Sequence, residues 1–351
     1  MAMKSPVPAS TLRTIDDLIA AGLAPSGARA MLDVVAARYA VAVTPEMAAL
    51  INPDDPADPI ARQFIPRFEE LVTTPEERAD PIGDSAHSPL PGIVHRYPDR
   101  VLLKLTHTCP VYCRFCFRRE MVGPQGHGTL DGPELEAALD YVAARPDIFE
   151  VIITGGDPFI LSARRVRDVT RRLAAIPHVR AIRWHTRVPV VQPGAITPGL
   201  VAALKVRNKA VYVGIHANHA RELTREACAA MALLNDAGIV LLSQSVLLRG
   251  INDSVEALGD LMRGFVANRV KPYYLHHGDL APGTGHFRVP LAEGLALVRA
   301  LRGALSGLAQ PTFVIDIPGG FGKVPVEWCE IGEDGVAMIT DRFGEKHQYG
   351  G

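Results

Sequence analysis

The spacing of apolar residues changes near residue 100 of the chain. Before it, segments with the period of amphipathic helices are separated by Pro-rich connections such as NPDDPADPIA. These helical segments are TIDDLIAAGL, SGARAMLDVVAARY and TPEMAALI. We therefore predict a helical lead-in over residues 1–95.

After residue 100, short apolar runs rich in β-branched residues alternate with longer amphipathic segments. The runs are RVLLKLT, FEVIIT, VRAIRWHT, VYVGIHA, IVLLSQSV, KPYYLHH and TFVIDIP. Such alternation predicts an α/β fold with a parallel sheet, either a barrel or a doubly wound sheet. Polar motifs directly follow the runs, which favours a barrel because barrels collect their chemistry at the C-terminal strand ends. We predict a partial (β/α)6-type barrel over residues 96–325 and a closing β-hairpin about GEDG in residues 326–351.

Composition limits the classes of partner. The formal charge is -1 and 21% of residues are charged, which argues against nucleic acid or an anionic membrane as the main partner. The first residues, MAMKSPVPAS, contain no apolar leader, and no stretch reaches the ~18 apolar residues of a membrane span. We therefore expect a cytoplasmic protein with reduced thiols.

Cys228 and Cys329 lie singly in apolar-patterned segments, where we expect them to pack in the core.

The other three cysteines, Cys109, Cys113 and Cys116, stand at i, i+4 and i+7 in THTCPVYCRFC. Thiolates are ligands of Fe–S clusters and of zinc. Three of them fill three corners of a [4Fe–4S] cluster and leave one iron open. A structural zinc ion requires four ligands, and His107 or His127 would then supply the fourth, so both interpretations stay open on spacing alone.

The CxxxCxxC loop, placed directly after a predicted strand, resembles that of the radical S-adenosylmethionine (SAM) enzymes and their partial barrel. The resemblance implies that the open iron binds SAM, and that a reducing partner such as flavodoxin or ferredoxin drives its cleavage to a 5′-deoxyadenosyl radical. The GGDP motif (Gly155, Gly156, Asp157) supports SAM binding, because glycine lets backbone approach a polar ligand closely. HANH has two histidines three apart, as in some zinc sites, but the resemblance places His216, together with Gln244, near SAM instead.

A narrower resemblance covers roughly residues 85–330. The motifs PGIVHRYPDRVLL, CRFCFRR, HANH, SQSVLLRGIND, PYYLHHGDL, GHFR and IDIPGGFGKVPV are similar, in this order, to those of the lysine 2,3-aminomutase family. This implies a second cofactor, pyridoxal 5′-phosphate (PLP), with Lys323 as its Schiff-base lysine. Taken alone, Lys323 is equally consistent with a surface lysine beside a glycine-rich turn (Gly319, Gly320, Gly322). The resemblance assigns the phosphate to Arg96 and Arg100, with Arg187 as a third arginine.

The family also implies the substrate and the reaction. Arg118 matches the arginine that pairs with the substrate carboxylate, and Asp279 and Asp316 match two aspartates that bind the ε-ammonium of lysine. Two buried carboxylates are costly without a cationic ligand, and relatives acting on glutamate replace them. We therefore expect an isomerase that converts L-lysine to β-lysine by a 1,2-amino shift and regenerates SAM. A glutamate mutase and a non-catalytic Fe–S or zinc protein are the alternatives.

Some positions depart from the longer members of the family. Ser254 stands where a zinc cysteine is expected, and no cysteine-rich segment follows residue 329, so we expect no such zinc site and leave a homo-oligomer open. Glu120 replaces a frequent arginine, and His276 a frequent tyrosine near PLP. His276 is similar to the branch that makes (R)-β-lysine for elongation factor P, but that branch lacks the aspartate kept here as Asp316.

Overall fold

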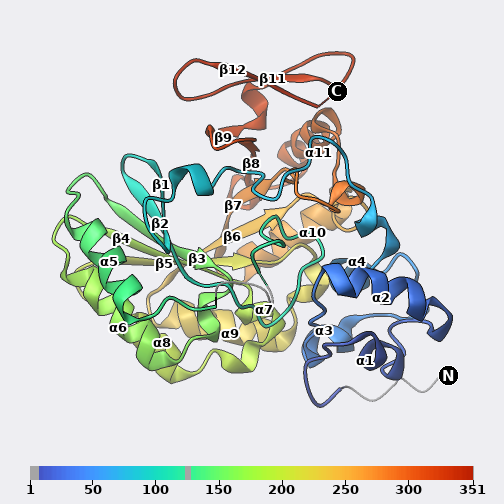
Figure 1. Ribbon diagram of the computed structural model, residues 1–351, viewed down its shortest axis with the longest axis horizontal. Helices are drawn as coiled ribbons and strands as arrows, with labels where there is room; N and C mark the ends of the chain where they lie inside the picture. The colour runs from blue at the N-terminus through green and yellow to red at the C-terminus, as the bar shows by residue number, and fades with distance from the viewer. Residues whose placement is uncertain (1–7, 123–127, 351) are drawn as a thin grey trace.

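A large curved sheet organises the chain (Figure 1). The computed structural model describes residues 8–122 and 128–350. Nine strands follow one another in sequence order across this sheet, and the seven from β2 to β8 run parallel. They are β2 (Arg100–Thr106), β3 (Glu150–Gly155), β4 (Ala181–Thr186), β5 (Ala210–His216), β6 (Val240–Val246), β7 (Val270–His276) and β8 (Thr312–Ile317). The edge strands β1 (Ile93–Tyr97) and β9 (Gly322–Pro325) are antiparallel.

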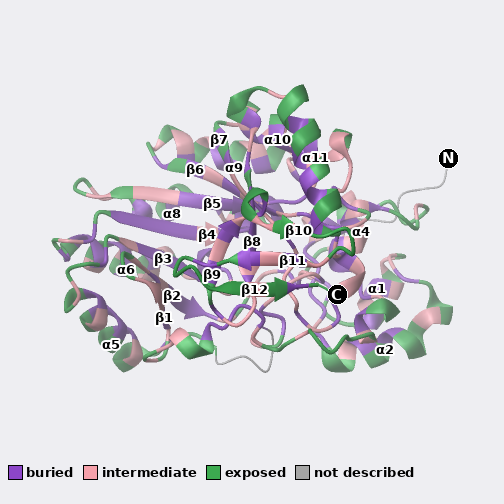
Figure 2. Cartoon of the chain, turned by 90° about the horizontal axis from the view of Figure 1, so that it is seen from above, coloured by how far each residue is buried: buried purple, intermediate pink, exposed green. Residues whose placement is uncertain are grey.

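Helices connect the parallel strands and cover the outer face of the sheet (Figure 1). Most begin at a side-chain cap, such as Asp131 before α5 and Ser254 before α10. The connecting helices are α5 (Gly132–Ala143), α6 (Ala163–Ala175), α7 (Val188–Val191), α8 (Pro198–Leu204), α9 (Arg225–Asp236), α10 (Val255–Ala267) and α11 (Leu291–Ala304). Buried residues concentrate on the strands and exposed ones on the outer helix faces (Figure 2). The predicted partial (β/α)6-type barrel is confirmed, with β8 as a seventh parallel strand.

The N-terminal segment packs beside the barrel (Figure 1). Its helices are α1 (Ile15–Ala20), α2 (Arg29–Arg38), α3 (Pro45–Leu50) and α4 (Pro59–Phe64). Phe64 and Ile60 of α4 are fully buried and join the same apolar core as the strands. This segment therefore brings α4 and the residues after it against the barrel, where Gln63 contacts Arg187 and Glu70 contacts Arg114.

The C-terminal residues form more than the predicted hairpin. A three-stranded antiparallel sheet contains β10 (Glu330–Ile331), β11 (Ala337–Thr340) and β12 (Lys346–Tyr349). The third strand, KHQY, is not predicted because only its tyrosine is apolar and buried, so apolar and polar residues do not alternate along it. Among the described residues, no helix is long and apolar enough to cross a membrane.

Candidate functional site

A cavity of about 470 Å³ extends along the parallel strands, from the first residues of β2 and β3 to the C-terminal ends of the strands. The strands, the loop after β2 and the edge strands β1 and β9 all contribute to its wall. Every site residue that the sequence predicts lines this one cavity: Arg96, Arg100, Cys109, Cys113, Cys116, Arg118, Gly155, Gly156, Asp157, Arg187, His216, Gln244, Asp279, Asp316 and Lys323. Residues more than two hundred positions apart are therefore brought together, while the role of each remains a prediction.

The loop with the three cysteines follows β2 and packs against the end of β3. The Gly156 N–H donates to the Thr106 carbonyl at 2.5 Å, and the Asp157 N–H donates to the Thr108 carbonyl at 2.9 Å. A Cβ on Gly156 would lie 2.4 Å from the Thr108 carbonyl oxygen, and one on Gly155 would lie 2.5 Å from that of Thr106. The two glycines are thus required for close approach of the cysteine loop itself, a reason that the motif alone did not reveal.

The three thiols are free, half-buried and line the cavity. Burial raises the pKa of Cys109 well above its usual value and that of Cys116 to about 11. Burial also raises the pKa of Cys113, although Arg187 partly offsets it. Bound iron would favour the thiolates by its charge.

Within residues 8–122 and 128–350, no three His, Cys, Asp or Glu side chains are gathered as ligands of a single metal ion. In a multi-iron cluster each cysteine binds a different iron, so the three thiols need not converge on one metal position. Of the two histidines considered as a fourth zinc ligand, His127 lies outside the described residues, and the His107 backbone N–H donates to the Gly128 carbonyl at 2.7 Å.

Two buried carboxylates hold the arginines of the cysteine loop. Glu70 accepts hydrogen bonds from Arg114 Nε at 2.9 Å and Nη2 at 2.6 Å, and also pairs with Arg119. Asp84 accepts from Arg118 Nη2 at 2.9 Å. Burial opposes ionisation of Asp84, but Arg118 outweighs it and lowers the Asp84 pKa. The N-terminal segment therefore fixes the cysteine loop.

Arg187 follows β4 and is buried beside the cysteine loop. Its Nη1 donates to Cys113 Sγ at 3.1 Å, and its Nη2 donates to Glu222 Oε2 at 2.5 Å and Gln63 Oε1 at 2.6 Å. Asp157 accepts from the Arg187 N–H at 2.6 Å and from Thr186 Oγ1 at 2.7 Å, so it joins the ends of β3 and β4. The two terminal nitrogens of Arg187 thus serve Cys113, Glu222 and Gln63, while its Nε is buried without a hydrogen-bond partner among the described residues, so its role at the PLP phosphate stays a prediction.

Two histidines meet on β4 and β5 at the cavity wall. His216 Nε2 lies 3.2 Å from His185 Nδ1, and His216 pairs in register with Gln244 of β6. Burial lowers the pKa of His216 to about 3 and that of His185 well below its usual value, so both rings are neutral at physiological pH. His185 Nε2 is buried without a hydrogen-bond partner among the described residues. Sequence reasoning missed His185, since a histidine inside a strand is ordinarily a core residue.

Lys323 lies on β9, directly opposite Asp316 of β8. Its Nζ forms an ion pair with Asp316 and lies 3.1 Å from His276 Nδ1. Tyr97 accepts a 2.7 Å hydrogen bond from the Lys323 backbone N–H and so fixes the strand. The preceding turn has positive φ at Gly319, Gly320 and Gly322, with values of 91°, 96° and 110°.

The two predicted substrate aspartates carry opposite pKa shifts. Burial, reinforced by the charge of Asp316, raises the pKa of Asp279 to about 8. Burial opposes ionisation of Asp316 too, but Lys323 and His276 outweigh it and lower the Asp316 pKa. At neutral pH the pair therefore holds one negative charge, already matched by Lys323, and one neutral carboxyl.

The residues that sequence reasoning missed include several charged groups around this cavity. Glu70, Asp84 and Glu222 are buried, and Arg183 pairs with Glu150 at 3.0 Å on the cavity wall. A single acidic residue in a loop carries no signal of burial, so no pattern could have identified them. Ser254, where the family has a zinc cysteine, caps α10 by accepting from the Ala257 N–H at 3.1 Å.

Comparisons with known proteins agree with this arrangement. The model of the Radical SAM superfamily matches residues 103–262. The L-lysine 2,3-aminomutase of Acetoanaerobium sticklandii is 43% identical over 286 residues, which are 82% of this chain and 69% of that protein. That of Clostridium subterminale is 43% identical over 82% of this chain and 68% of its own length. The glutamate 2,3-aminomutase of Clostridioides difficile is 36% identical over 83% and 68%.

The matched region contains the cysteine loop, the GGDP motif and the paired histidines, and the longer alignments span most of the chain. Membership implies a [4Fe–4S] cluster, SAM, an amino acid substrate and a source of electrons. The cavity, the loop and the alignments lead to one assignment: the chain belongs to the lysine 2,3-aminomutase family of radical SAM enzymes.

Proposed function

We propose that the protein is a PLP-dependent L-lysine 2,3-aminomutase, which moves the α-amino group of lysine to the neighbouring carbon and forms β-lysine. One observation carries the proposal. Lys323, Asp279 and Asp316 line the same cavity as the cysteine loop. That cavity thus joins a candidate PLP lysine, two carboxylates for a distant ammonium and the thiols of a radical-generating cluster.

The cluster and SAM fit the cysteine part of the cavity. Cys109, Cys113 and Cys116 are free thiols on one loop, and His185 Nε2 offers a buried, unpartnered nitrogen at the wall among the described residues. When bound, the reduced cluster and SAM supply a carbon radical that removes hydrogen from an unactivated carbon. The required electron would come from a low-potential partner such as flavodoxin or ferredoxin.

PLP fits the part around Lys323. Lys323 Nζ would hold it covalently, and the Tyr274 ring centroid lies 5.7 Å from that nitrogen. Arg96 lines this wall, and its Nη2 donates to Asp84 at 3.2 Å while its Nε is buried without a hydrogen-bond partner within the described part of the chain. Arg100 lines the same wall and stacks 3.8 Å from the Tyr97 ring. When bound, PLP supplies a conjugated ring that can accept unpaired electron density beside the migrating amine.

The charges around Lys323 favour lysine as substrate. In the protein alone, Asp316 lies 3.8 Å from Arg96 Nη1 and pairs with the Lys323 nitrogen. Once that nitrogen is engaged by PLP, Asp316 and Asp279 are available for the ammonium of a substrate side chain. A buried carboxylate pair is strongly disfavoured without a cation, so a substrate with a terminal ammonium gains most from this site.

The substrate carboxylate is assigned to Arg118, although this arginine also donates to Asp84. Apolar walls, including Ile82, Val94, Leu102 and Ile152, would exclude water and competing hydrogen donors from the reacting carbon.

Glutamate is the second candidate, because a glutamate 2,3-aminomutase is 36% identical to this chain. Its side-chain carboxylate would have to lie beside Asp279 and Asp316. Like charges in a buried site repel strongly, which makes glutamate the weaker candidate.

The test is a substrate panel. The anaerobic protein, loaded with iron and sulfide, PLP and SAM and then reduced, is incubated with L-lysine, L-glutamate and other amino acids, and β-amino isomers are separated by chromatography. We expect β-lysine only. Formation of another isomer without β-lysine would overturn the substrate. Failure to form any isomer, with iron and PLP both bound, would overturn the mutase assignment.

A further inference from the structure

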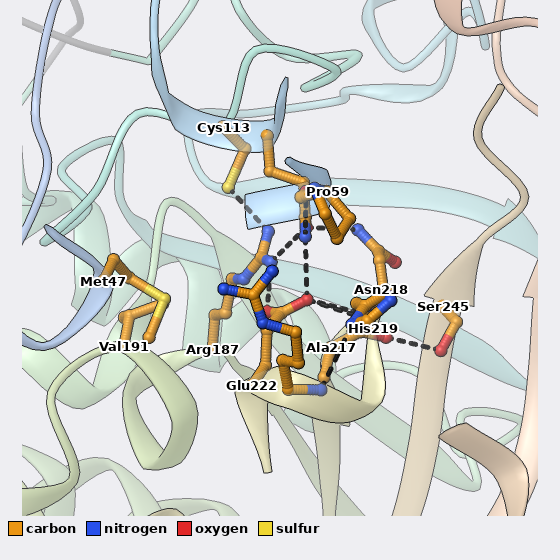
Figure 3. A network of polar contacts seen from close by, with 12 residues as sticks. Met47, Pro59, Cys113, Arg187, Val191, Ala217, Asn218, His219, Glu222 and Ser245 are labelled. Atoms are coloured by element: carbon orange, nitrogen blue, oxygen red, sulfur yellow. Dashed lines mark hydrogen bonds and ion pairs between the residues drawn. The ribbon is translucent and has the colours of Figure 1, made fainter. Parts of the chain in front are cut away.

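A buried cation donates directly to one of the three cysteines. Arg187 is 7% exposed, and its Nη1 lies 3.1 Å from Cys113 Sγ. Figure 3 shows this guanidinium between the sulfur of Cys113 and the carboxylate of Glu222. Neither resemblance nor spacing assigns Arg187 to the cysteine loop.

Glu222 holds Arg187 in this orientation. Its Oε2 accepts from Arg187 Nη2, and its Oε1 accepts from the backbone N–H groups of Asn218 and His219 (Figure 3). Both backbone hydrogen bonds are 2.9 Å long. Gln63 bridges Arg187 and Glu222, because its Oε1 accepts a hydrogen bond from Arg187 at 2.6 Å while its Nε2 donates one to Glu222 at 2.9 Å. Glu222 is completely buried, so water cannot replace these bonds.

The whole arrangement fixes one guanidinium edge on one sulfur. Burying an ion pair is costly, and packing alone would be served as well by apolar side chains. A hydrogen-bond donor to a cluster thiolate, by contrast, changes the electronic properties of the metal centre.

We propose that Arg187 is a positioning residue that raises the reduction potential of the cluster through its N–H···S hydrogen bond to Cys113, with Glu222 and Gln63 holding it in place. The inference rests on the proposed cluster site. On reduction, one electron from the low-potential partner enters the cluster and no covalent bond forms or breaks. The added negative charge strengthens the attraction to the fixed cation, so the reduced form gains more from Arg187 than the oxidised form.

The experiment removes the hydrogen bond without changing the local charge. The double variant Arg187→Met with Glu222→Gln deletes one positive and one negative group, and the amide oxygen of the introduced glutamine would still accept the two backbone N–H groups. The midpoint potential is measured by anaerobic redox titration followed by electron paramagnetic resonance. We expect about a tenfold lower equilibrium constant for reduction, which is about 59 mV more negative for a one-electron couple.

The matched control removes another arginine and glutamate pair, Arg183→Met with Glu150→Gln. Glu150 is the first residue of β3, whereas the cysteine loop contacts the other end of that strand, and Arg183 pairs with it at 3.0 Å. We expect the control to keep the wild-type potential. A wild-type potential in the Arg187 and Glu222 double variant would overturn the inference, as would an equal shift in the control.

A measurement on the unmutated protein covers the case in which the double variant does not bind a cluster. Arginine labelled with ¹⁵N in its guanidinium group only is incorporated, and pulsed electron paramagnetic resonance of the reduced cluster is recorded. We expect a ¹⁵N coupling, and its absence would overturn the inference. The iron content of the wild-type protein distinguishes two negative results. If iron is bound but no ¹⁵N coupling is seen, the inference about Arg187 is wrong. If no iron is bound, the proposed cluster site and the proposed function are wrong.

Discussion

The cysteine part and the Lys323 part of the cavity balance charge in different ways. Around the cysteines, each buried arginine has a permanent carboxylate partner: Glu70 pairs with Arg114 and Arg119, and Glu222 pairs with Arg187. Around Lys323, Asp316 pairs with the lysine ammonium, whereas burial and the charge of Asp316 raise the pKa of Asp279 to about 8 and leave this second carboxyl neutral at neutral pH.

The difference separates scaffold from binding site. Charges that are paired within the protein keep the cysteine loop in one geometry, which a cluster with fixed ligands requires. Asp316 pairs with Lys323 and also lies 3.8 Å from Arg96, and it would become more accessible to a substrate if Lys323 were engaged by the proposed PLP. The first arrangement should therefore govern stability and the second should govern affinity.

Glu70→Gln should have the largest effect, and it should be on stability. The substitution leaves Arg114 and Arg119 buried without their anion, and breaking such a pair costs about 3–5 kcal/mol. Urea unfolding monitored by circular dichroism measures the loss. The neighbouring Glu69→Gln serves as the control, since Glu69 is exposed and should change stability by less than about 0.5 kcal/mol. Equal stability of the two variants would mean that the carboxylates around the cysteine loop do not govern stability.

Glu70 also shows where prediction from sequence ends. The strands and the cysteine loop could be predicted because each has a local pattern, apolar runs and close thiol spacing, whereas Lys323 is singled out only by the family resemblance, since its glycine-rich turn alone also fits a surface lysine. Glu70 and Glu222 lie in FEEL and ARELT, which look like ordinary solvated segments. Their burial arises only when the N-terminal segment packs on the barrel and places them opposite arginines. Pairing between charged residues far apart in the sequence can therefore be identified only from the structure.

Asp279→Asn should weaken lysine binding with little change in stability. The amide cannot pair with the substrate ammonium as an ion, and losing one charge-assisted hydrogen bond costs about 2 kcal/mol, or roughly 30-fold in affinity. Competition by L-norleucine, which has the same carbon chain without the ammonium, is the internal control and should be unaffected. If both amino acids lose affinity equally, Asp279 does not recognise the ammonium.

Lysine affinity should also rise with pH up to about 8. Burial and Asp316 raise the pKa of Asp279 to about 8, and a bound ammonium favours the ionised carboxylate. Below this pKa, lysine must displace a proton from Asp279, so affinity should increase roughly tenfold per pH unit well below pH 8. Calorimetric titrations in buffers of different ionisation heat measure the released proton. Asp279→Asn should release one proton fewer than the wild type, and identical proton release would contradict the assignment.

His276→Phe should have the smallest effect. His276 Nδ1 lies 3.1 Å from Lys323 Nζ, but burial, together with the Lys323 charge, lowers its pKa to about 4. At neutral pH it therefore offers Lys323 a hydrogen-bond acceptor and no charge, a contribution of about 1 kcal/mol. PLP affinity, measured by absorbance on adding PLP to the cofactor-free protein, should fall by less than about tenfold. Lys323→Ala gives the reference for complete loss of covalent PLP binding. An equally large loss of PLP affinity in His276→Phe would mean that the neutral ring does far more than accept one hydrogen bond. His276 would then belong with Asp316 among the groups that control PLP binding at Lys323.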